Sequence, residues 1–198
     1  MKTFPARAAL AALLLPLPLG LAATPAAAAV DASDPGRFID TLADEGFGAL
    51  RGGNKAAART QFRTLLSQHF AVDALGDRLI RRWSAKITPA QRAAYKAALP
   101  NFIIGTYADR LAQYRDADLK VVRTVPAGAS AQVMTTVTRP GARPIPATWT
   151  VDRVGSGYKV SNLTVGGINL ALAQAADFDA VIQRQGFDAL IAMMKKRG

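Results

Sequence analysis

The sequence predicts an α+β domain in which helices pack on one face of a curved, mainly antiparallel sheet of four strands. Apolar residues recur every three or four positions up to about residue 114, a spacing typical of amphipathic helices. From residue 119 to 165 they alternate, as in strands with one buried face. The helical spacing then returns and continues to the C-terminus. Helices, a sheet and helices again is the order expected for this class.

The N-terminus has the features of a secretory signal peptide. Lys2 and Arg7 precede an apolar run from Ala8 to Leu21, and small residues follow up to Ala29. The run is shorter than the ~20 apolar residues that a membrane-spanning helix needs. We therefore expect export by the general secretory pathway and cleavage after residue 29, which leaves residues 30–198 as one domain. An uncleaved anchor is the alternative.

Capping residues mark the predicted helices of the N-terminal half. The first helix begins at the cap Asp34 and ends at Gly52, and the second begins at Asn54. Asp73 is expected to cap a short third helix that reaches Trp83. Each of these segments carries apolar residues on one side, so we expect all three helices to pack against a common core.

A capping box starts the next helix. Thr88 and Gln91 stand at the cap and the third position, where each side chain can satisfy a free backbone N–H of the other. The helix should run to about Tyr114, with a kink or break near Leu99 because Pro100 removes one donor and clashes with the preceding turn. Its second half carries an apolar, aromatic face of Phe102, Ile103, Tyr107, Leu111 and Tyr114.

Four strands with short loops follow and predict an antiparallel meander. They are LKVVRTV (119–125), SAQVMTTVTR (130–139), IPATWTVDRV (145–154) and YKVSNLTV (158–165). Alternation indicates that one face of the sheet carries Val133, Thr135, Val137, Trp149, Val151, Val160 and Thr164 in some mixture.

The pair Gly166-Gly167 separates the last strand from the C-terminal helices. Glycines between a strand and a helix can cradle a phosphate, but this pair lacks the lysine and the longer loop of such a site. We interpret the pair as a turn that leads the strand directly into a helix. That helix should end at Gly186, and a last helix should end in the basic run 195–197.

Charge and cysteine content narrow the function. The chain has 25 basic and 14 acidic residues, a net charge of +11, and no cysteine. An exported basic protein does not meet genomic DNA, so anionic lipid headgroups or an acidic partner surface are better candidates. A charge that only keeps the protein soluble is an equal alternative. Without cysteine there is no disulfide, no thiolate metal site, no thiol nucleophile and no lipoprotein anchor.

Catalytic equipment is sparse. His69 is the only histidine and Glu45 the only glutamate, and the 13 aspartates show no convergent spacing. We therefore predict no catalytic residue, no metal and no cofactor. Carriage of an apolar ligand is the simplest function, while a small cone-fold hydrolase or isomerase and a purely structural envelope-assembly factor are the alternatives from other classes. The aromatic stripe shares its face with aliphatic residues, which favours a core or cavity over a nucleic-acid track.

The order of three stretches resembles the periplasmic MlaC-like family, also called the toluene-tolerance family. The stretches are FRTLLSQHFAVDALGDRLIRRWSAKITPAQRAAYKAAL (62–99), FIIGTYADRLAQY (102–114) and YKVSNLTVGGINLALAQAADFDAVIQRQGFDALIAMM (158–194). The resemblance implies a cone like that of nuclear transport factors, with a deep apolar cavity between sheet and helices. It implies a soluble phospholipid carrier that shuttles between an inner-membrane ABC transporter complex with a lipid-binding ring protein and an outer-membrane lipoprotein–porin complex.

The resemblance also assigns residues to the cavity by region and face. They are Phe102, Ile103, Tyr107, Leu111, Val137, Trp149, Val151, Val160, Val165, Ile168, Leu172, Phe178, Ile182 and Met193. Some family members look suited to hopanoids, so a rigid polycyclic lipid is the alternative ligand.

Overall fold

The computed structural model describes residues 30–198, apart from the side chains of residues 108–112. The predicted signal peptide and the side chain of Leu111 lie outside the described residues. The elements are α1 (Pro35–Arg51), α2 (Lys55–His69), α3 (Val72–Leu79), α4 (Pro89–Leu111), η1 (Ala112–Tyr114), β1 (Asp118–Ala127), β2 (Ser130–Thr138), β3 (Ile145–Val154), β4 (Gly157–Val165), β5 (Ile168–Asn169), α5 (Leu170–Gln185) and α6 (Phe187–Arg197).

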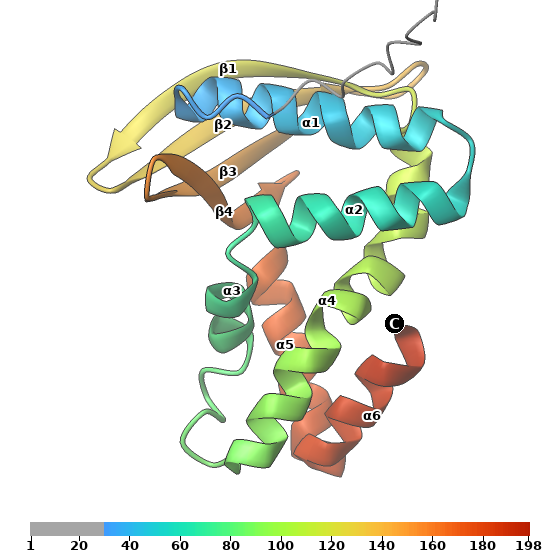
Figure 1. Ribbon diagram of the computed structural model, residues 1–198, viewed down its shortest axis with the longest axis vertical. Helices are drawn as coiled ribbons and strands as arrows, with labels where there is room; N and C mark the ends of the chain where they lie inside the picture. The colour runs from blue at the N-terminus through green and yellow to red at the C-terminus, as the bar shows by residue number, and fades with distance from the viewer. Residues whose placement is uncertain (1–29) are drawn as a thin grey trace, which may run out of the picture.

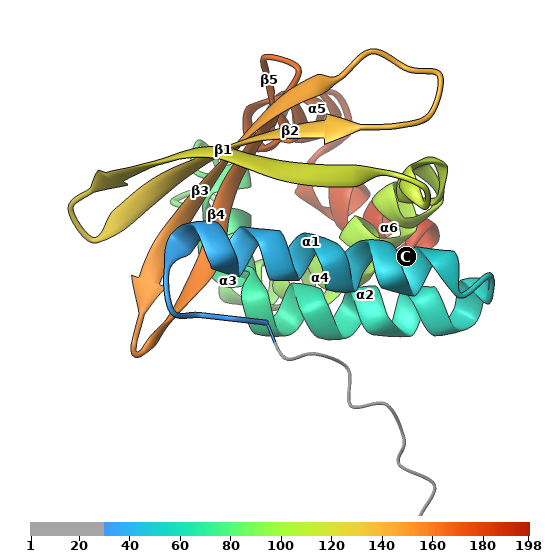
Figure 2. The ribbon, with the colours of Figure 1, turned by 90° about the horizontal axis from the view of Figure 1, so that it is seen from above.

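The strands form one antiparallel sheet in the order β1-β2-β3-β4-β5. Helix α1 lies across the sheet with α2 beside it, and α3 to α6 form a second layer of helices at one end (Figure 1, Figure 2). The predicted α+β class is confirmed. No helix among residues 30–198 is both long and apolar enough to cross a membrane.

Two predicted helix starts are confirmed by their hydrogen bonds. The Asp34 carboxylate accepts from the backbone N–H groups of Gly36 and Arg37 at 2.8 and 3.0 Å. Thr88 and Gln91 bond reciprocally, since the Gln91 N–H donates to Thr88 Oγ1 at 3.1 Å and the Thr88 N–H donates to Gln91 Oε1 at 3.0 Å. These caps fix where α1 and α4 leave the preceding loops.

The third helix differs from its prediction. Its N-cap is Ala71, and Asp73 lies in its first turn. The cause is a long-range contact: the Ala71 N–H donates to the carbonyl of Val160 at 2.9 Å, which holds the chain beside β4 until the helix begins. The helix ends at Leu79, and Trp83 follows in a series of turns, where its indole N–H donates to Asp179 at 2.5 Å.

Of the predicted kink or break near Leu99, the break does not occur, because helix α4 continues through Pro100 from Pro89 to Leu111. Proline removes one helical hydrogen bond, but α4 packs along α2, α3 and α6, and this tertiary packing holds the helix together on both sides of the proline. Gly105 allows the closest of these approaches, because it faces the carbonyl of Arg197 at the end of α6.

The sheet has one more strand than predicted. Gly166 and Gly167 adopt positive φ values of 57° and 83°, which reverses the chain so that Ile168 pairs with Val165. The prediction that this pair only turns the chain into a helix was therefore incomplete, because a two-residue strand precedes α5.

A bulge corrects the facing of one predicted residue. The register shifts by one residue between β3 and β4, where Thr150 pairs with Asn162 and Val151 pairs with Val160. Beyond this shift Thr164 pairs with Thr148, on the face opposite Trp149. The prediction for Thr164 was thus wrong.

Two apolar cores hold the fold together. One lies between α1 and the sheet, with Phe38, Ile39, Leu42, Leu65, Leu119, Val133, Val151 and Val160 at its centre. The other lies among α3, α4, α5 and α6, with Ile80, Tyr95, Leu99, Phe102, Phe178, Leu190 and Met194. Within it the Tyr95 hydroxyl donates to the carbonyl of Gly76 at 2.9 Å, and burial raises the pKa of this phenol. The sheet core and the helical core thus form at different places in the molecule.

Candidate functional site

The inner face of the sheet has two halves. In the first half Ala131 pairs with Val151 and Val151 with Val160, and this row belongs to the core beneath α1. The rings and methyl groups of Phe38 and Ile39 cover it, and both residues are 1% exposed. This half is therefore occupied by the protein itself.

The second half lies toward the C-terminal ends of β2 and β4, the N-terminal end of β3, and β5. Here Thr135 pairs with Ala147, Ala147 with Val165, and Val165 with Ile168, so one row crosses four strands. Val137 lies next along β2, and both Val137 and Trp149 pack against the edge of the core beneath α1. Thr135 and Ala147 are buried, at 2% and 4% exposure, and apart from Thr135 the side chains of this half are apolar.

The exposed apolar groups of this region continue onto α5. Ile168 is 61% exposed and Leu172, in the first turn of α5, is 66% exposed. Val137, Trp149 and Val165 are half-buried. Neighbouring exposed aliphatic side chains are typical of ligand or partner sites, whereas single ones are common on protein surfaces. Five apolar side chains of this region are exposed or half-buried, and we call them the open strip: Val137, Trp149, Val165, Ile168 and Leu172.

A polar bond holds the tryptophan of the open strip. Its indole N–H donates to Thr135 Oγ1 at 3.1 Å, and the Thr135 hydroxyl donates to the carbonyl of Ala147 at 3.3 Å. The indole N–H of Trp149 and the hydroxyl of Thr135 thus both have hydrogen-bond partners, and only the apolar part of the Trp149 ring remains for other contacts.

Helices α4 and α5 meet at Tyr107, whose hydroxyl donates to Gln174 Oε1 at 3.3 Å. Ile103, one turn earlier on α4, is half-buried beside the helical core. Among the described residues α4 packs on helices and makes no extensive backbone contact with the sheet. Tyr107 and Ile103 therefore lie in the layer of helices and not on the sheet.

Thirteen of the fourteen predicted cavity residues fall into separate groups, and the fourteenth, Leu111, has no described side chain. Val137, Trp149, Val165, Ile168 and Leu172 form the open strip. Val151 and Val160 are buried beneath α1, and Phe102, Phe178 and Ile182 are buried in the helical core, where the Phe102 and Phe178 rings lie 5.4 Å apart. Ile103 and Met193 pack at the edge of that core, and Tyr107 bonds to α5. Their assignment to a cavity stays a prediction.

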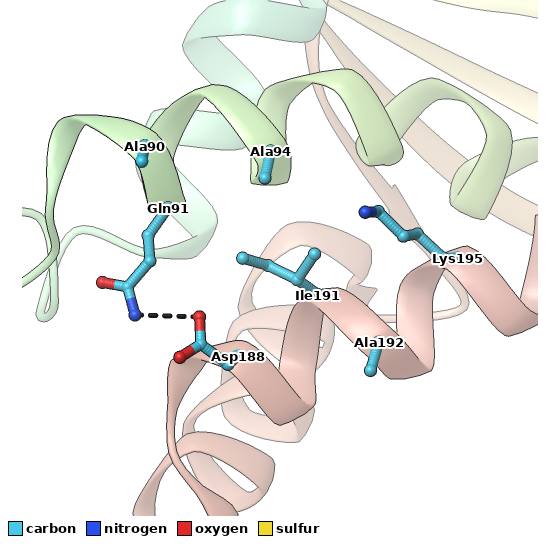
Figure 3. A pocket seen from close by; sticks show the side chains of 7 residues that line it. All are labelled: Ala90, Gln91, Ala94, Asp188, Ile191, Ala192 and Lys195. Carbon is cyan, nitrogen blue, oxygen red and sulfur yellow. Dashed lines mark hydrogen bonds between the residues drawn. The ribbon is translucent and has the colours of Figure 1, made fainter.

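Two grooves lie elsewhere on the described surface. The α4–α6 groove has a volume of about 400 Å³ and is lined by Ala90, Gln91, Ala94, Asp188, Ile191, Ala192 and Lys195. Gln91 donates to Asp188 at 2.9 Å across its end, and Ile191 points from α6 toward α4 (Figure 3). The second groove, of about 450 Å³, lies among α2, α3, α4 and β4. We call it the cationic groove, since Arg63, Lys96 and Lys159 line it.

Within the described residues no three histidine, aspartate or glutamate side chains gather as metal ligands. The single histidine, His69, packs on the Phe38 ring at a centroid distance of 5.9 Å, and burial lowers its pKa. The main feature of the candidate site is therefore the apolar surface of the open strip.

The comparison with known families shows to which family the chain belongs. The family described as MlaC protein matches residues 38–196, which is most of the chain. The chain belongs to the MlaC family. The predicted resemblance is thereby confirmed. The MlaC family is periplasmic, and membership in it identifies a lipid-binding carrier and not an enzyme.

A solved structure shares the fold of this MlaC-family chain. It is the phospholipid-binding protein from Ralstonia solanacearum, determined in complex with a phospholipid. The TM-score is 0.68, and the match covers 83% of this chain and 97% of that protein at 22% identity. The expected fold is confirmed by this likeness.

Sequence reasoning missed two residues of the MlaC-family sheet. Ala147 and Leu163 share the inner face with Trp149, because Ala147 pairs with Val165 and Leu163 with Trp149. Alternation along β3 contains the signal for Ala147. Leu163 has no such signal, since the bulge at Ser161 reverses the alternation of β4.

Proposed function

We propose that this protein carries a phospholipid in the periplasm, with the acyl chains lying against the open strip. The observation that supports this most directly is the succession of apolar Val165, Ile168 and Leu172 along β4, β5 and α5 in a chain of the MlaC family. Two of these side chains are exposed in the protein without ligand, and acyl chains are the apolar surface that would cover them. The Ralstonia relative is described as phospholipid-binding, which agrees with this ligand.

The energetics favour a protein surface over water for such a ligand. Each methylene group that leaves water contributes about 0.8 kcal/mol. Two long acyl chains therefore do not cross an aqueous space unaided at a useful rate, whereas a carrier needs only an apolar surface and an opening. No bond is made or broken, in keeping with the sparse catalytic groups.

The predicted cavity residues would then act in two ways. Val137, Trp149 and Val165 would contact the chains from the sheet, and Tyr107 and Ile103 would contact them from α4, with Leu111 on the same helix face by position. The buried residues Phe102, Val151, Val160, Phe178 and Ile182, together with Met193, would back these walls. They would reach the ligand only where it moves the two cores apart.

The carrier would be exported by its N-terminal signal and act as a single domain of residues 30–198. We propose that it exchanges phospholipid with an inner-membrane ABC transporter complex bearing a lipid-binding ring protein, and with an outer-membrane lipoprotein–porin complex. The net charge favours anionic surfaces at both ends of this path.

Native mass spectrometry of protein purified from the periplasm tests the proposal. We expect one bound phospholipid per chain and uptake of fluorescent phospholipid from liposomes. The variant Ile168→Glu with Leu172→Glu should lose most of this uptake, because two carboxylates would face the chains. Val154→Glu is the matched control, since Val154 is 51% exposed at the other end of the sheet.

Three outcomes would contradict the proposal in different ways. Absence of lipid together with absence of uptake would remove the carrier function. A hopanoid in the extract would keep the carrier and replace the ligand. Equal uptake by the double variant, the Val154→Glu control and the unaltered protein would place the chains away from the open strip.

A further inference from the structure

Three cationic side chains from three elements line the cationic groove. Arg63 comes from α2, Lys96 from α4 and Lys159 from β4. None of the groove's lining residues is among the fourteen predicted for the lipid chains. The groove therefore needs an explanation of its own.

The positive charge of the groove is only partly neutralised. Lys96 pairs with Asp73 and Asp77 at 3.4 Å each. Arg63 donates to the neutral amide oxygen of Asn101, and among the side chains that the structure describes neither Arg63 nor Lys159 forms an ion pair. Of the acidic residues, only Asp73 lines the groove, so an excess of positive charge remains there.

The field of Lys159 acts on its surroundings. It is one of the causes that lower the pKa of His69, after burial, and Glu45 acts in the opposite direction. A cation that repels a second cation at this place attracts an anion for the same reason.

The floor of the groove is apolar. Leu66 comes from α2, Phe70 follows as the C-cap of α2, and Val72 and Pro100 come from α3 and α4. A volume of about 450 Å³ is far larger than one inorganic phosphate requires and lies in the usual range of small-molecule sites. An organic molecule with an anionic group fits this combination of cationic side chains and an apolar floor.

We propose that the cationic groove binds the phosphate group of a phosphate monoester or diester through Arg63 and Lys159. The guanidinium offers the paired N–H donors that suit phosphate oxygens, and the ammonium adds a point charge. Lys96 contributes less, because it already pairs with the carboxylates of Asp73 and Asp77. The phosphate can belong to a soluble ester or to a lipid headgroup at a membrane surface, and the two sources are separable by experiment.

The soluble source is tested with glycerol 3-phosphate at low ionic strength. Amide shifts in an NMR titration should concentrate on residues 63–74 and saturate. The membrane source is tested by flotation with vesicles of phosphatidylglycerol or of phosphatidylcholine. Saturable binding of the soluble ester alone identifies a small-molecule site, and preferential flotation with phosphatidylglycerol identifies a headgroup site.

A series of variants that differ in the sign of the charge change decides whether the groove is responsible. Arg63→Gln and Lys159→Gln should each weaken the binding that is found by about two- to fivefold, as for partly exposed ion pairs, and Asp73→Asn should strengthen it. Lys120→Gln removes an exposed cation of β1 outside the groove and is the matched control.

Thermal unfolding of each variant checks that the fold is kept. The proposal is overturned if glycerol 3-phosphate causes no saturable shift at 63–74 and vesicle binding is the same in all variants. It is also overturned if Lys120→Gln weakens binding as much as Lys159→Gln, since net charge alone would then explain it. Lipid uptake through the open strip should be unchanged by Lys159→Gln, which separates this site from the proposed function.

Discussion

The indole N–H of Trp149 donates to the hydroxyl of Thr135 at 3.1 Å, across two neighbouring strands. Thr135 is 2% exposed, so the bond lies on the inner face of the sheet with its acceptor shielded from water. It fixes the orientation of the tryptophan ring, which in turn determines the apolar surface on offer to a ligand. The wall of the proposed lipid site is therefore built on one buried hydrogen bond.

Replacing Thr135 by valine tests the strength of this arrangement. Thr135→Val keeps the shape of the side chain but leaves the indole N–H without its acceptor, so we expect the free energy of unfolding to fall by about 1–3 kcal/mol. Urea denaturation followed by circular dichroism measures it. Thr138→Val on the same strand is the control, because Thr138 is exposed and should change stability by less than about 0.5 kcal/mol. Equal losses in both variants would contradict the prediction.

Local chemistry made much of the fold predictable. Thr88 and Gln91 satisfy each other within one helical turn, and Asp34 caps the residues that follow it, so short stretches of sequence suffice. Loops of a few residues between strands imply antiparallel neighbours, and the sheet order follows from that. Features that depend on distant residues were missed. The start of α3 is set by Val160, and no pattern near Asp73 contains that contact.

The candidate site was predictable only in part for the same reason. Val151 and Trp149 alternate identically along β3, and alternation assigns both to one face. Which of them a helix covers depends on where Phe38 of α1 comes to lie, some hundred positions earlier in the chain. The bulge at Ser161 adds a second uncertainty, since a single inserted residue exchanges the faces of everything after it in β4.

Gly105 sets the distance between α4 and α6. A Cβ atom added there would overlap the carbonyl oxygen of Arg197. We expect Gly105→Ala to separate the end of α6 from α4 and to lower the free energy of unfolding by about 1–3 kcal/mol. Gly46→Ala in α1 is the matched helical control, because nothing lies within 4 Å of its added Cβ. It should stabilise by up to about 1 kcal/mol, and a gain in the Gly105→Ala variant would contradict the close approach.

His69 should make the stability depend on pH. Burial lowers the pKa of His69 below its usual value of 6.5, with Lys159 of β4 adding to this and Glu45 of α1 opposing it. Below about pH 6.5, His69 therefore binds a proton in the unfolded chain but not in the folded chain. The free energy of unfolding falls as the pH drops toward the lowered pKa of the folded state. Urea midpoints at pH 7.5 and 5.5 measure this loss. His69→Gln should reduce it, and an unchanged pH dependence would assign the loss to other groups.

A link between α4 and α5 should control the exchange of lipid. Tyr107 and Gln174 meet at 3.3 Å between these helices, and the chain has no native cysteine to interfere with labelling. If acyl chains reach the open strip by separating α4 from α5, a short bismaleimide joining Tyr107→Cys to Gln174→Cys should slow phospholipid transfer between liposomes by on the order of tenfold, a rise of about 1.4 kcal/mol in the barrier. The control joins Gln91→Cys to Asp188→Cys, which links α4 to α6 at a contact of 2.9 Å away from the strip. Equal slowing by both links would indicate that general stiffening limits transfer, whereas slowing by the first alone supports entry beside α5.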